Sequence, residues 1–515
     1  IFASNIGSEH LIGLAGAGAS SGMAMAHWEI QGWMILILGW VFVPFYTRSM
    51  VYTMPEFLER RYNPQSRTIL SVISLVSYVL TKVAVTVYAG GLVFQQVFGI
   101  KELWGIDFFW IAAIGLVVLT ALYTIFGGMK SVLYTSVLQT PILLLGSLII
   151  LVLGFKELGG WDEMMRVCGA VTVNDYGDTM TNLIRSNDDA NFPWLGALIG
   201  SAIIGFWYWC TDQFIVQRVL SGKNEMEARR GTIFGAYLKL LPVFLFLIPG
   251  MIAFALHQKY IGAGGEGFLP MLANGTANAD AAFPTLVAKL LPAGVKGLVV
   301  CGILAALMSS LASLFNSSAM LFTIDFYKRF KPETPEKKLV GIGQIATIVI
   351  VVLGILWIPI MRSVGDVLYT YLQDVQSVLA PGIAAAFLLG ICWKRTSAQG
   401  GMWGLISGMV IGLTRLGAKV YYSNAGEVAD STFKYLFYDM NWLFFCGWMF
   451  LFCIIVVIVV SLATEAPTAE KIQGLVFGTA TKEQKAATRA SWNHWDIIHT
   501  VIILAITAAF YWYFW

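Results

Sequence analysis

The chemistry of this sequence is concentrated in a few polar side chains that interrupt long apolar runs. The ionisable members, with one amide, are His10, Glu29, Lys82, Asp212, Lys239, Gln373 and Asp374. A charge in the middle of a membrane is costly, so each is treated as a functional candidate. Glu29 and Lys239 lie well inside their runs and are expected to bind a substrate. Lys82 has no carboxylate nearby in the sequence and fits a structural role. Asp374 fits a gate or a packing residue as well as a ligand.

Two adjacent hydroxyl groups, those of Ser309 and Ser310, lie deep in another apolar run. Serines in membrane helices commonly donate a hydrogen bond to the preceding turn. Sodium, however, is a hard cation, and hard cations are held by several oxygen ligands, neutral ones included. Carbonyl groups freed where a helix unwinds would complete such a set. The pair leaves two interpretations open, helix packing and ion binding.

Two short segments are expected to break the helices that contain them. One covers residues 5–10, with Gly13, Gly16 and Gly18 close behind, and the other covers residues 207–213. Glycine and polar residues at this depth loosen the backbone and free its carbonyl and amide groups. The segments lie in the first and sixth apolar runs, which is where an inverted repeat of five plus five spans has its broken helices. Small residues also mark plain helix packing, and composition does not separate the two.

The overall composition indicates the class of protein. Of 515 residues, 57% are hydrophobic and only 12% are charged, whereas a soluble domain carries about 25% charged residues. This leaves too little polar surface for a water-soluble globule, so a soluble enzyme, a nucleic-acid binder and a disordered chain are excluded. A net charge of +3 is too small to indicate a polyanionic partner. The sequence predicts a multi-span membrane protein.

A run of about 20 mostly apolar residues can cross a bilayer, and roughly 13 such runs are present. They are expected near residues 1–20, 27–47, 67–99, 105–126, 129–155, 193–219, 229–257, 286–325, 338–362, 366–393, 398–419, 440–463 and 496–514. About 20 of the 33 Lys and Arg residues fall in one alternating set of loops, which the positive-inside rule places in the cytoplasm. The chain begins at Ile1, inside the first run, and a preceding segment is expected to be missing.

Seven stretches resemble the sodium/glucose cotransporter family, within the sodium–solute symporters. In family order they are FASNIGSEH (2–10), GLAGAGASSG (13–22), YTMPEFLERR (52–61), WYWCTDQFIVQR (207–218), YLKLLP (237–242), SSLASLFNSSAMLFTIDFY (309–327) and FLLGICWKR (387–395). The resemblance implies an all-α transmembrane fold, a five-plus-five inverted-repeat (LeuT-like) core with additional C-terminal helices. The first repeat would cover residues 1–155, with its first helix truncated, and an extracellular loop 156–192. The second repeat would cover 193–394, and the additional C-terminal transmembrane helices 395–515.

The same resemblance implies two binding sites. The main sodium site would use the carbonyl groups of Ala3, Ile6 and Ala306 and the hydroxyl groups of Ser309 and Ser310. The sugar site would consist of Asn5, His10, Trp28, Glu29, Tyr208, Trp209, Lys239 and Gln373, with Tyr208 also as the inner gate and Trp28 as a stacking face. The side-chain chemistry suits a polyol, because Glu29 accepts hydrogen bonds from hydroxyl groups and Lys239 donates them. The set contains no arginine, which argues against an anionic substrate held by a bidentate clamp.

Three positions depart from the family pattern. Ser136 stands where some members have an aspartate that binds a second sodium, and Ala312 replaces a second-site hydroxyl group. Their loss favours one sodium ion per sugar. Gly205 stands where members often have a polar sugar contact, so the preferred sugar stays open, and the pairing of NIGSEH with Trp28 and Glu29 keeps myo-inositol open as well.

These observations predict a sodium-coupled symporter that imports a neutral, glucose- or galactose-like sugar by alternating access. The alternatives are a myo-inositol or other polyol symporter and a sugar sensor that does not transport. An enzyme is not expected, because neither a nucleophile with its base nor a metal-ligand set is apparent. The expected partners are the sugar or polyol, the sodium ion and the bilayer of a plasma or inner membrane. No nucleic acid and no obligate protein partner are expected.

Overall fold

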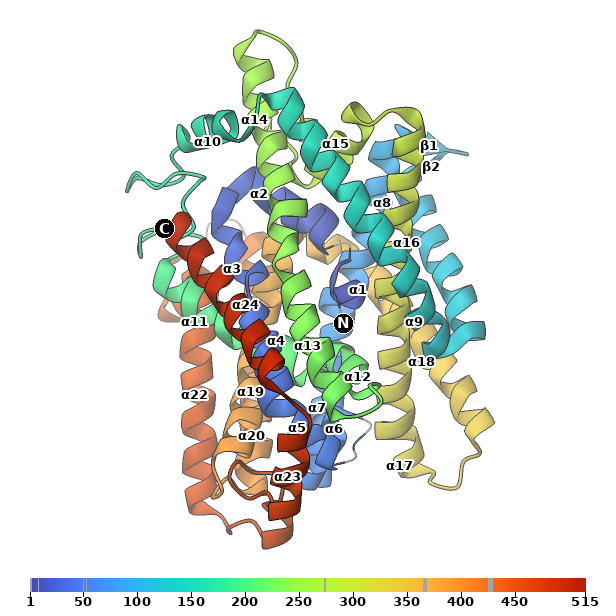
Figure 1. The fold of residues 1–515 in the computed structure, drawn as a ribbon, viewed down its shortest axis with the longest axis vertical. Coiled ribbons are helices and arrows are strands. Elements are labelled where there is room, and N and C mark those ends of the chain that lie inside the picture. Colours follow the sequence, from blue (N-terminus) through green and yellow to red (C-terminus); the bar gives the residue numbers. More distant parts are fainter. Residues whose placement is uncertain are drawn as a thin grey trace.

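Long helices, most of them along the long axis of the molecule, make up the chain (Figure 1). The computed structural model describes residues 2–7, 9–49, 51, 53–272, 275–364, 368–424 and 429–515. Strands contribute only a small hairpin in this part of the chain, formed by β1 (Glu102–Leu103) and β2 (Ile106–Asp107). The expected all-helical architecture is confirmed.

The first helix is broken, as the sequence predicts. The helical turn α1 (Phe2–Asn5) ends at Ile6 and Gly7, and the π-helical η1 (Glu9–Leu14) and α2 (Ala15–Ser21) follow. The glycine is needed at the break, because a Cβ atom on Gly7 would lie 2.4 Å from Ser310 Oγ. The backbone near Ile6 therefore leaves regular helical geometry directly beside the serine pair.

The remaining elements of the first half follow in chain order. They are η2 (Gly22–Met25), α3 (Ala26–Glu29), α4 (Gly32–Ile37), η3 (Leu38–Phe42), α5 (Val43–Ser49), α6 (Met54–Arg61), α7 (Pro64–Ser77), η4 (Tyr78–Val83), α8 (Ala84–Phe98) and α9 (Phe108–Leu158). Thr53 precedes α6 as its N-cap residue, and its side chain accepts a hydrogen bond from the Glu56 amide, which is the usual role of an N-cap residue. The expected spans at 105–126 and 129–155 form one continuous helix, α9.

The second half repeats the broken pattern. Its elements are α10 (Trp161–Gly169), α11 (Trp194–Gly205), η5 (Phe206–Thr211), α12 (Gln213–Leu220), α13 (Glu225–Lys239), η6 (Val243–Leu247), α14 (Ile248–Gly262), η7 (Ala279–Ala281), α15 (Ala282–Leu290), α16 (Ala293–Met320), η8 (Leu321–Tyr327), α17 (Lys328–Phe330), α18 (Glu336–Val364) and α19 (Leu368–Cys392). Between η5 and α12, Asp212 has an extended backbone (φ −78°, ψ 126°). The second predicted helix break is thus confirmed as well.

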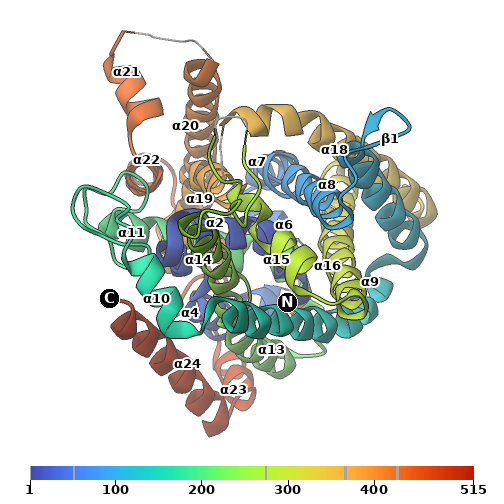
Figure 2. The same ribbon diagram turned by 90° about the horizontal axis from the view of Figure 1, so that it is seen from above.

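The last part of the chain surrounds this core. It consists of α20 (Ala398–Asn424), α21 (Thr432–Lys434), η9 (Tyr435–Asp439), α22 (Trp442–Ala463), η10 (Ala469–Lys471), α23 (Lys482–Ala490) and α24 (His494–Tyr513). From above, α2 and α19 lie near the centre, whereas α18 and α24 lie at the periphery (Figure 2). A Cβ atom on Gly408 would lie 2.6 Å from Gly382 Cα, so α19 and α20 pack closely because both residues are glycine.

Ten helical runs in the described residues are long and apolar enough to cross a membrane. The number expected from sequence was larger for three reasons. The runs at 1–20 and 27–47 join in one helical stretch, Glu9–Ser49. In the run at 105–126, only Phe108–Leu122, the described first part of α9, counts as an apolar helix, and it is too short. Helix α20 is not among the ten. The chain is a multi-pass membrane protein.

Candidate functional site

The polar residues singled out from the sequence meet in a cavity inside the bundle. The cavity lies where the broken first helix faces η4, η5, α16 and α19. Its lining is Asn5, Glu9, His10, Trp28, Gln31, Thr81, Lys82, Val85, Thr86, Ile204, Gly205, Tyr208, Trp209, Phe214, Lys239, Ser310, Leu314, Tyr369, Leu372, Gln373 and Gln376. Of the expected sugar-site residues, Glu29 alone is missing from this lining, and it lies directly behind His10 and Lys239.

Glu29 is the centre of a buried charged cluster. Its side chain has no solvent exposure, and its Oε2 atom lies 2.6 Å from Lys239 Nζ and 3.3 Å from His10 Nε2. Its Oε1 atom accepts a hydrogen bond of 2.5 Å from the Tyr369 hydroxyl group. A buried carboxylate needs such partners, because a charge without them is strongly destabilising. The structure thus brings together Glu29, Lys239 and His10, and adds Tyr369, which the sequence analysis did not identify.

Several buried polar atoms in this cavity have no hydrogen-bond partner within the protein. They are Asn5 Oδ1, His10 Nδ1, Trp28 Nε1, Ser310 Oγ and Gln373 Oε1. Buried polar atoms are normally paired, so an unpaired one calls for an explanation such as a ligand. Four of these five atoms belong to residues of the expected sugar site. The cavity therefore offers both hydrogen-bond donors and acceptors to a polar molecule.

Aromatic rings surround the polar cluster. Trp209 has the Lys239 ammonium group 5.5 Å from its ring centroid. Tyr208, the expected inner gate, accepts a hydrogen bond of 3.1 Å from Asn5 Nδ2. Trp28 stacks on Trp442 of α22 with ring centroids 5.4 Å apart. One face of the expected stacking residue is thus covered by a helix from outside the predicted core.

Lys82 belongs to the cavity, together with a carboxylate that its local sequence does not provide. Its ammonium group forms an ion pair with Asp212, which also accepts a hydrogen bond of 2.9 Å from Tyr78. The same ammonium group lies 3.8 Å from the centroid of the Phe214 ring. The partner comes from the second helix break, so a search for carboxylates near Lys82 in sequence missed it. The sequence did contain a signal for this ion pair, because Lys82 and Asp212 are a cation and an anion in apolar spans of opposite repeats.

Gln31 occupies the space beside Gly205. A Cβ atom on Gly205 would lie 2.4 Å from Gln31 Oε1, and Gln31 Nε2 donates a hydrogen bond of 2.8 Å to the Ser201 carbonyl group. From the sequence, Gly205 is expected to leave this part of the cavity without a polar group. The amide of Gln31, from the turn between α3 and α4, stands there instead.

The residues of the expected sodium site flank the break in the first helix. Ala3 lies in α1, which packs against α16, and the α16 helix carries Ala306, Ser309 and Ser310. Ser310 is buried, its hydroxyl oxygen has no protein partner, and it borders Gly7. The position is suited to a small cation, because the unpaired Ser310 hydroxyl group faces a non-helical segment of backbone at Ile6 and Gly7. Ala312 is buried without a hydroxyl group, and the side chain of Ser136 lies outside the described residues.

Asp374 points away from the cavity. Its carboxylate forms an ion pair with Lys419 of α20, and it is not among the lining residues. The sequence left three roles open for Asp374, those of a gate, a packing residue and a ligand, and this placement supports packing between α19 and α20.

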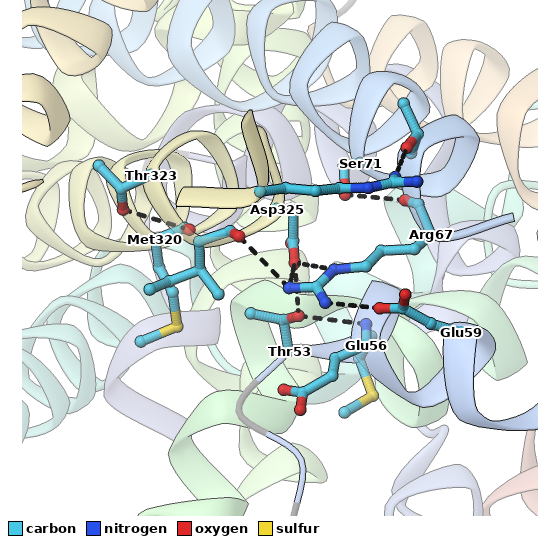
Figure 3. A network of polar contacts seen from close by, with 12 residues as sticks. Thr53, Glu56, Glu59, Arg67, Ser71, Met320, Thr323 and Asp325 are labelled. Atoms are coloured by element: carbon cyan, nitrogen blue, oxygen red, sulfur yellow. Dashed lines mark hydrogen bonds and ion pairs between the residues drawn. The ribbon is translucent and has the colours of Figure 1, made fainter. Parts of the chain in front are cut away.

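A second polar network joins the helices at the predicted cytoplasmic end (Figure 3). Arg67 of α7 lies 2.6 Å from both Glu59 Oε2 and Asp325 Oδ1, and Thr53 donates a hydrogen bond of 3.1 Å to the same Asp325 oxygen. Glu59 belongs to α6 and Asp325 to η8. The network therefore ties the short helix α6 and the start of α7 to the end of the helix that bears the serine pair.

Comparison with solved structures gives the class of protein. A Na⁺-coupled sialic acid symporter, solved in a substrate-bound outward-open state, aligns with 91% of this chain and 89% of its own, with a TM-score of 0.68 and 20% sequence identity. The chain therefore has the fold of this group of transporters, and the expected LeuT-like core with additional C-terminal helices is confirmed.

Sequence comparison gives the family. The model of the "Sodium:solute symporter family" matches residues 1–408. The sodium/myo-inositol cotransporter 2 of Homo sapiens is 36% identical over 492 residues, which cover 93% of this chain and 72% of the relative. The sodium/glucose cotransporter 1 of Ovis aries is 38% identical over 483 residues, which cover 90% and 72%. The chain belongs to the sodium:solute symporter family, and sodium is its coupling ion.

Proposed function

We propose that this transporter imports a neutral, glucose- or galactose-like sugar together with one sodium ion. The observation that carries the proposal is the cluster of Glu29, Lys239 and His10 beside unpaired polar atoms of Asn5 and Gln373. A sugar ring presents hydroxyl groups that donate and accept hydrogen bonds, and this cluster offers the complementary groups. Because no arginine is among the described residues that line the cavity, a neutral substrate is favoured over an anionic one.

The proposed sodium and sugar sites share the broken first helix. Asn5 and His10 would contact the sugar. The carbonyl groups of Ala3, before Asn5, and of Ile6, between Asn5 and His10, would contact sodium together with Ser310 on α16. Binding of sodium would hold α1 against α16 and so fix Asn5 and His10 where the sugar needs them. The two ligands would then favour the same conformation, which is the condition for coupling.

A polyol such as myo-inositol is the second candidate. It is favoured by the sodium/myo-inositol cotransporters among the relatives. The chemistry of Glu29 and Lys239 fits the hydroxyl groups of an inositol ring as well as those of a sugar ring. Gln31 beside Gly205 is the residue that we expect to distinguish the two, since it brings a polar amide to the part of the cavity where Gly205 has no side chain.

The test is uptake by the full-length protein in proteoliposomes. Labelled glucose, galactose and myo-inositol are compared, each with and without an inward sodium gradient. Accumulation above the external level that requires the gradient supports the symporter, and the preferred compound identifies the substrate. Binding without accumulation would contradict the proposal and support a sensor on the same fold.

A further inference from the structure

A second hollow lies on the outside of the bundle. It has a volume of about 750 Å³, and its walls come from α7, η4, η8 and α18. Its lining is almost wholly apolar: Leu75, Val76, Val79, Leu80, Phe322, Tyr327, Ile342, Ile345, Ala346, Val349, Ile350, Leu353, Leu356 and Trp357. Helix α18 lies at the periphery of the molecule (Figure 2), so this apolar groove opens toward the surrounding lipid.

The groove runs along α18 from its cytoplasmic end toward the middle of the membrane. On this helix the lining extends from Ile342 to Trp357, a rise of about 22 Å at 1.5 Å per residue. One leaflet contributes about half of a hydrocarbon core of about 30 Å. The groove is thus long enough for an extended acyl chain of the cytoplasmic leaflet.

Basic side chains stand at the cytoplasmic mouth of the groove. Tyr327, which lines the groove, also lines a neighbouring polar cavity with Lys331, Glu333 and Lys338. Lys331 Nζ lies 5.9 Å from the centroid of the Tyr327 ring. The cavity contains two lysines against one carboxylate, in a segment that also carries Lys328, Arg329 and Lys337. An apolar groove that ends at a positive cavity is complementary to a lipid with an anionic headgroup.

We propose that the groove binds an anionic phospholipid of the cytoplasmic leaflet. One acyl chain lies along α18, with Ala346 at the floor of the groove, and the phosphate group is held by Lys331 and Lys338. The site adjoins the network of Arg67 and Asp325, because η8 presents Phe322 and Tyr327 to the groove while its Asp325 binds Arg67. A bound lipid would therefore support η8 from the side opposite this network.

The test uses the full-length protein in vesicles of phosphatidylcholine and phosphatidylglycerol. The protein is extracted in mild detergent, and mass spectrometry measures the lipid that remains bound. We expect phosphatidylglycerol to be enriched, and the variant Lys331→Gln/Lys338→Gln to lower this enrichment by about 25-fold, since each of the two lysines near the membrane surface contributes about a fivefold preference. The matched control is Lys482→Gln/Lys485→Gln, which removes two lysines from α23.

A second pair of variants tests the groove itself. Ala346→Trp fills the floor of the groove and is expected to abolish retention of both lipids. Ile348→Trp places the same side chain at an exposed position of α18 outside the groove. This control variant is expected to leave retention unchanged. Three outcomes would overturn the proposal. These are equal retention of the two lipids by the wild-type protein, unchanged enrichment in the double lysine variant, and co-purification of a second polypeptide on the groove in place of lipid.

Discussion

At the scale of single residues, the chemistry of this transporter depends on how buried polar atoms are paired. Glu29 receives hydrogen bonds or charge from three side chains of three different elements, Lys239, His10 and Tyr369. These partners stabilise the carboxylate. All three also line the cavity, so they would lie between Glu29 and a bound substrate. We therefore expect the cluster to combine a structural and a binding role, which a single substitution can probe.

We expect Glu29→Gln to raise the sugar concentration for half-maximal sodium-driven uptake by roughly 10- to 100-fold. A hydrogen bond to a charged group contributes about 1.5–3 kcal/mol, and the amide removes the charge while it leaves the side-chain size nearly unchanged. Concentration-dependent uptake in proteoliposomes measures the change. Glu102→Gln, an exposed carboxylate in the hairpin, is the control. An unchanged sugar affinity in Glu29→Gln would rule out the binding role.

Ser310→Ala is expected to raise the sodium concentration for half-maximal uptake by about tenfold or more, since a hydroxyl ligand of the ion is lost. The matched control is Ser318→Ala, which removes another buried and unpaired hydroxyl group from the same helix. Uptake at fixed sugar and varied sodium distinguishes the two variants. The sodium assignment fails if both variants show the same sodium dependence as the wild-type protein.

Site residues that interrupt an apolar run or belong to a motif could be predicted from the sequence. Site residues that are recognisable only by their contacts in the folded protein could not. Glu29, Lys239 and His10 could be selected because each interrupts an apolar run or falls within a motif. Tyr369 and Gln31 could not, because a tyrosine or glutamine near a helix end is common and their partners lie far away in sequence. Lys82 was noticed and assigned a structural role, since its carboxylate, Asp212, lies in the opposite repeat.

At the scale of secondary-structure elements, the breaks in the first and sixth spans were predictable and the joining of α9 was not. Each break has a signal in the local sequence, the glycine and polar residues at 5–10 and the polar residues at 207–213, and the structure places Gly7 and the extended backbone of Asp212 at these breaks. The continuity of α9 across Pro141 has no such local signal, because proline normally interrupts a helix. Local rules therefore identify where a helix must end more easily than where two apolar runs remain joined.

The network in Figure 3 predicts the behaviour of α6 and η8. Asp325→Asn removes the charge that Arg67 binds, and loss of one partner of a buried ion pair is strongly destabilising. We expect amide hydrogen exchange to become at least about tenfold faster in α6 and η8. The control is Glu56→Gln, which affects a pair with the exposed Arg60, since such surface pairs contribute little. Equal exchange in both variants would show that the network does not hold these elements together.

Asp280 connects three elements at the opposite end. It lies in η7, accepts a hydrogen bond from the Leu368 amide at the start of α19, and borders Gly16 of α2. Burial raises the pKa of Asp280 from 3.8 to about 7, and the Leu368 hydrogen bond opposes this change. The folded protein thus binds a proton more tightly than the unfolded chain between these values, and its contribution to stability is lost as the pH rises through about 7.

We therefore expect Asp280→Asn to weaken the fall in melting temperature as the pH rises from about 4 to about 7. Asparagine keeps the oxygen that accepts from Leu368 but cannot ionise. Thermal unfolding of the purified protein across this range measures the slope, and Asp188→Asn, which changes an exposed carboxylate between α10 and α11, is the control. An identical slope in the wild-type protein and Asp280→Asn would contradict the prediction.

At the scale of the whole molecule, the number of sodium ions sets how far the substrate can be concentrated. One charge that moves through 100 mV contributes about 2.3 kcal/mol, and a tenfold sodium gradient adds about 1.4 kcal/mol. One sodium ion per sugar therefore limits accumulation to a few hundredfold, about 3.7 kcal/mol. A second ion would square this limit. The absence of a hydroxyl group at Ala312 is the reason to expect the smaller value.

The number of sodium ions per sugar can be determined from how the maximum accumulation ratio of the sugar changes with the sodium gradient. With the membrane potential clamped, the internal sugar concentration at steady state is measured while the sodium gradient is varied. For one ion, a tenfold steeper gradient raises the accumulation ratio by about tenfold, whereas for two ions it raises the ratio by about 100-fold. We expect the first dependence, because the proposed sodium site has a single set of oxygen ligands between α1 and α16. The second would require another sodium site in the bundle and would refute a stoichiometry of one.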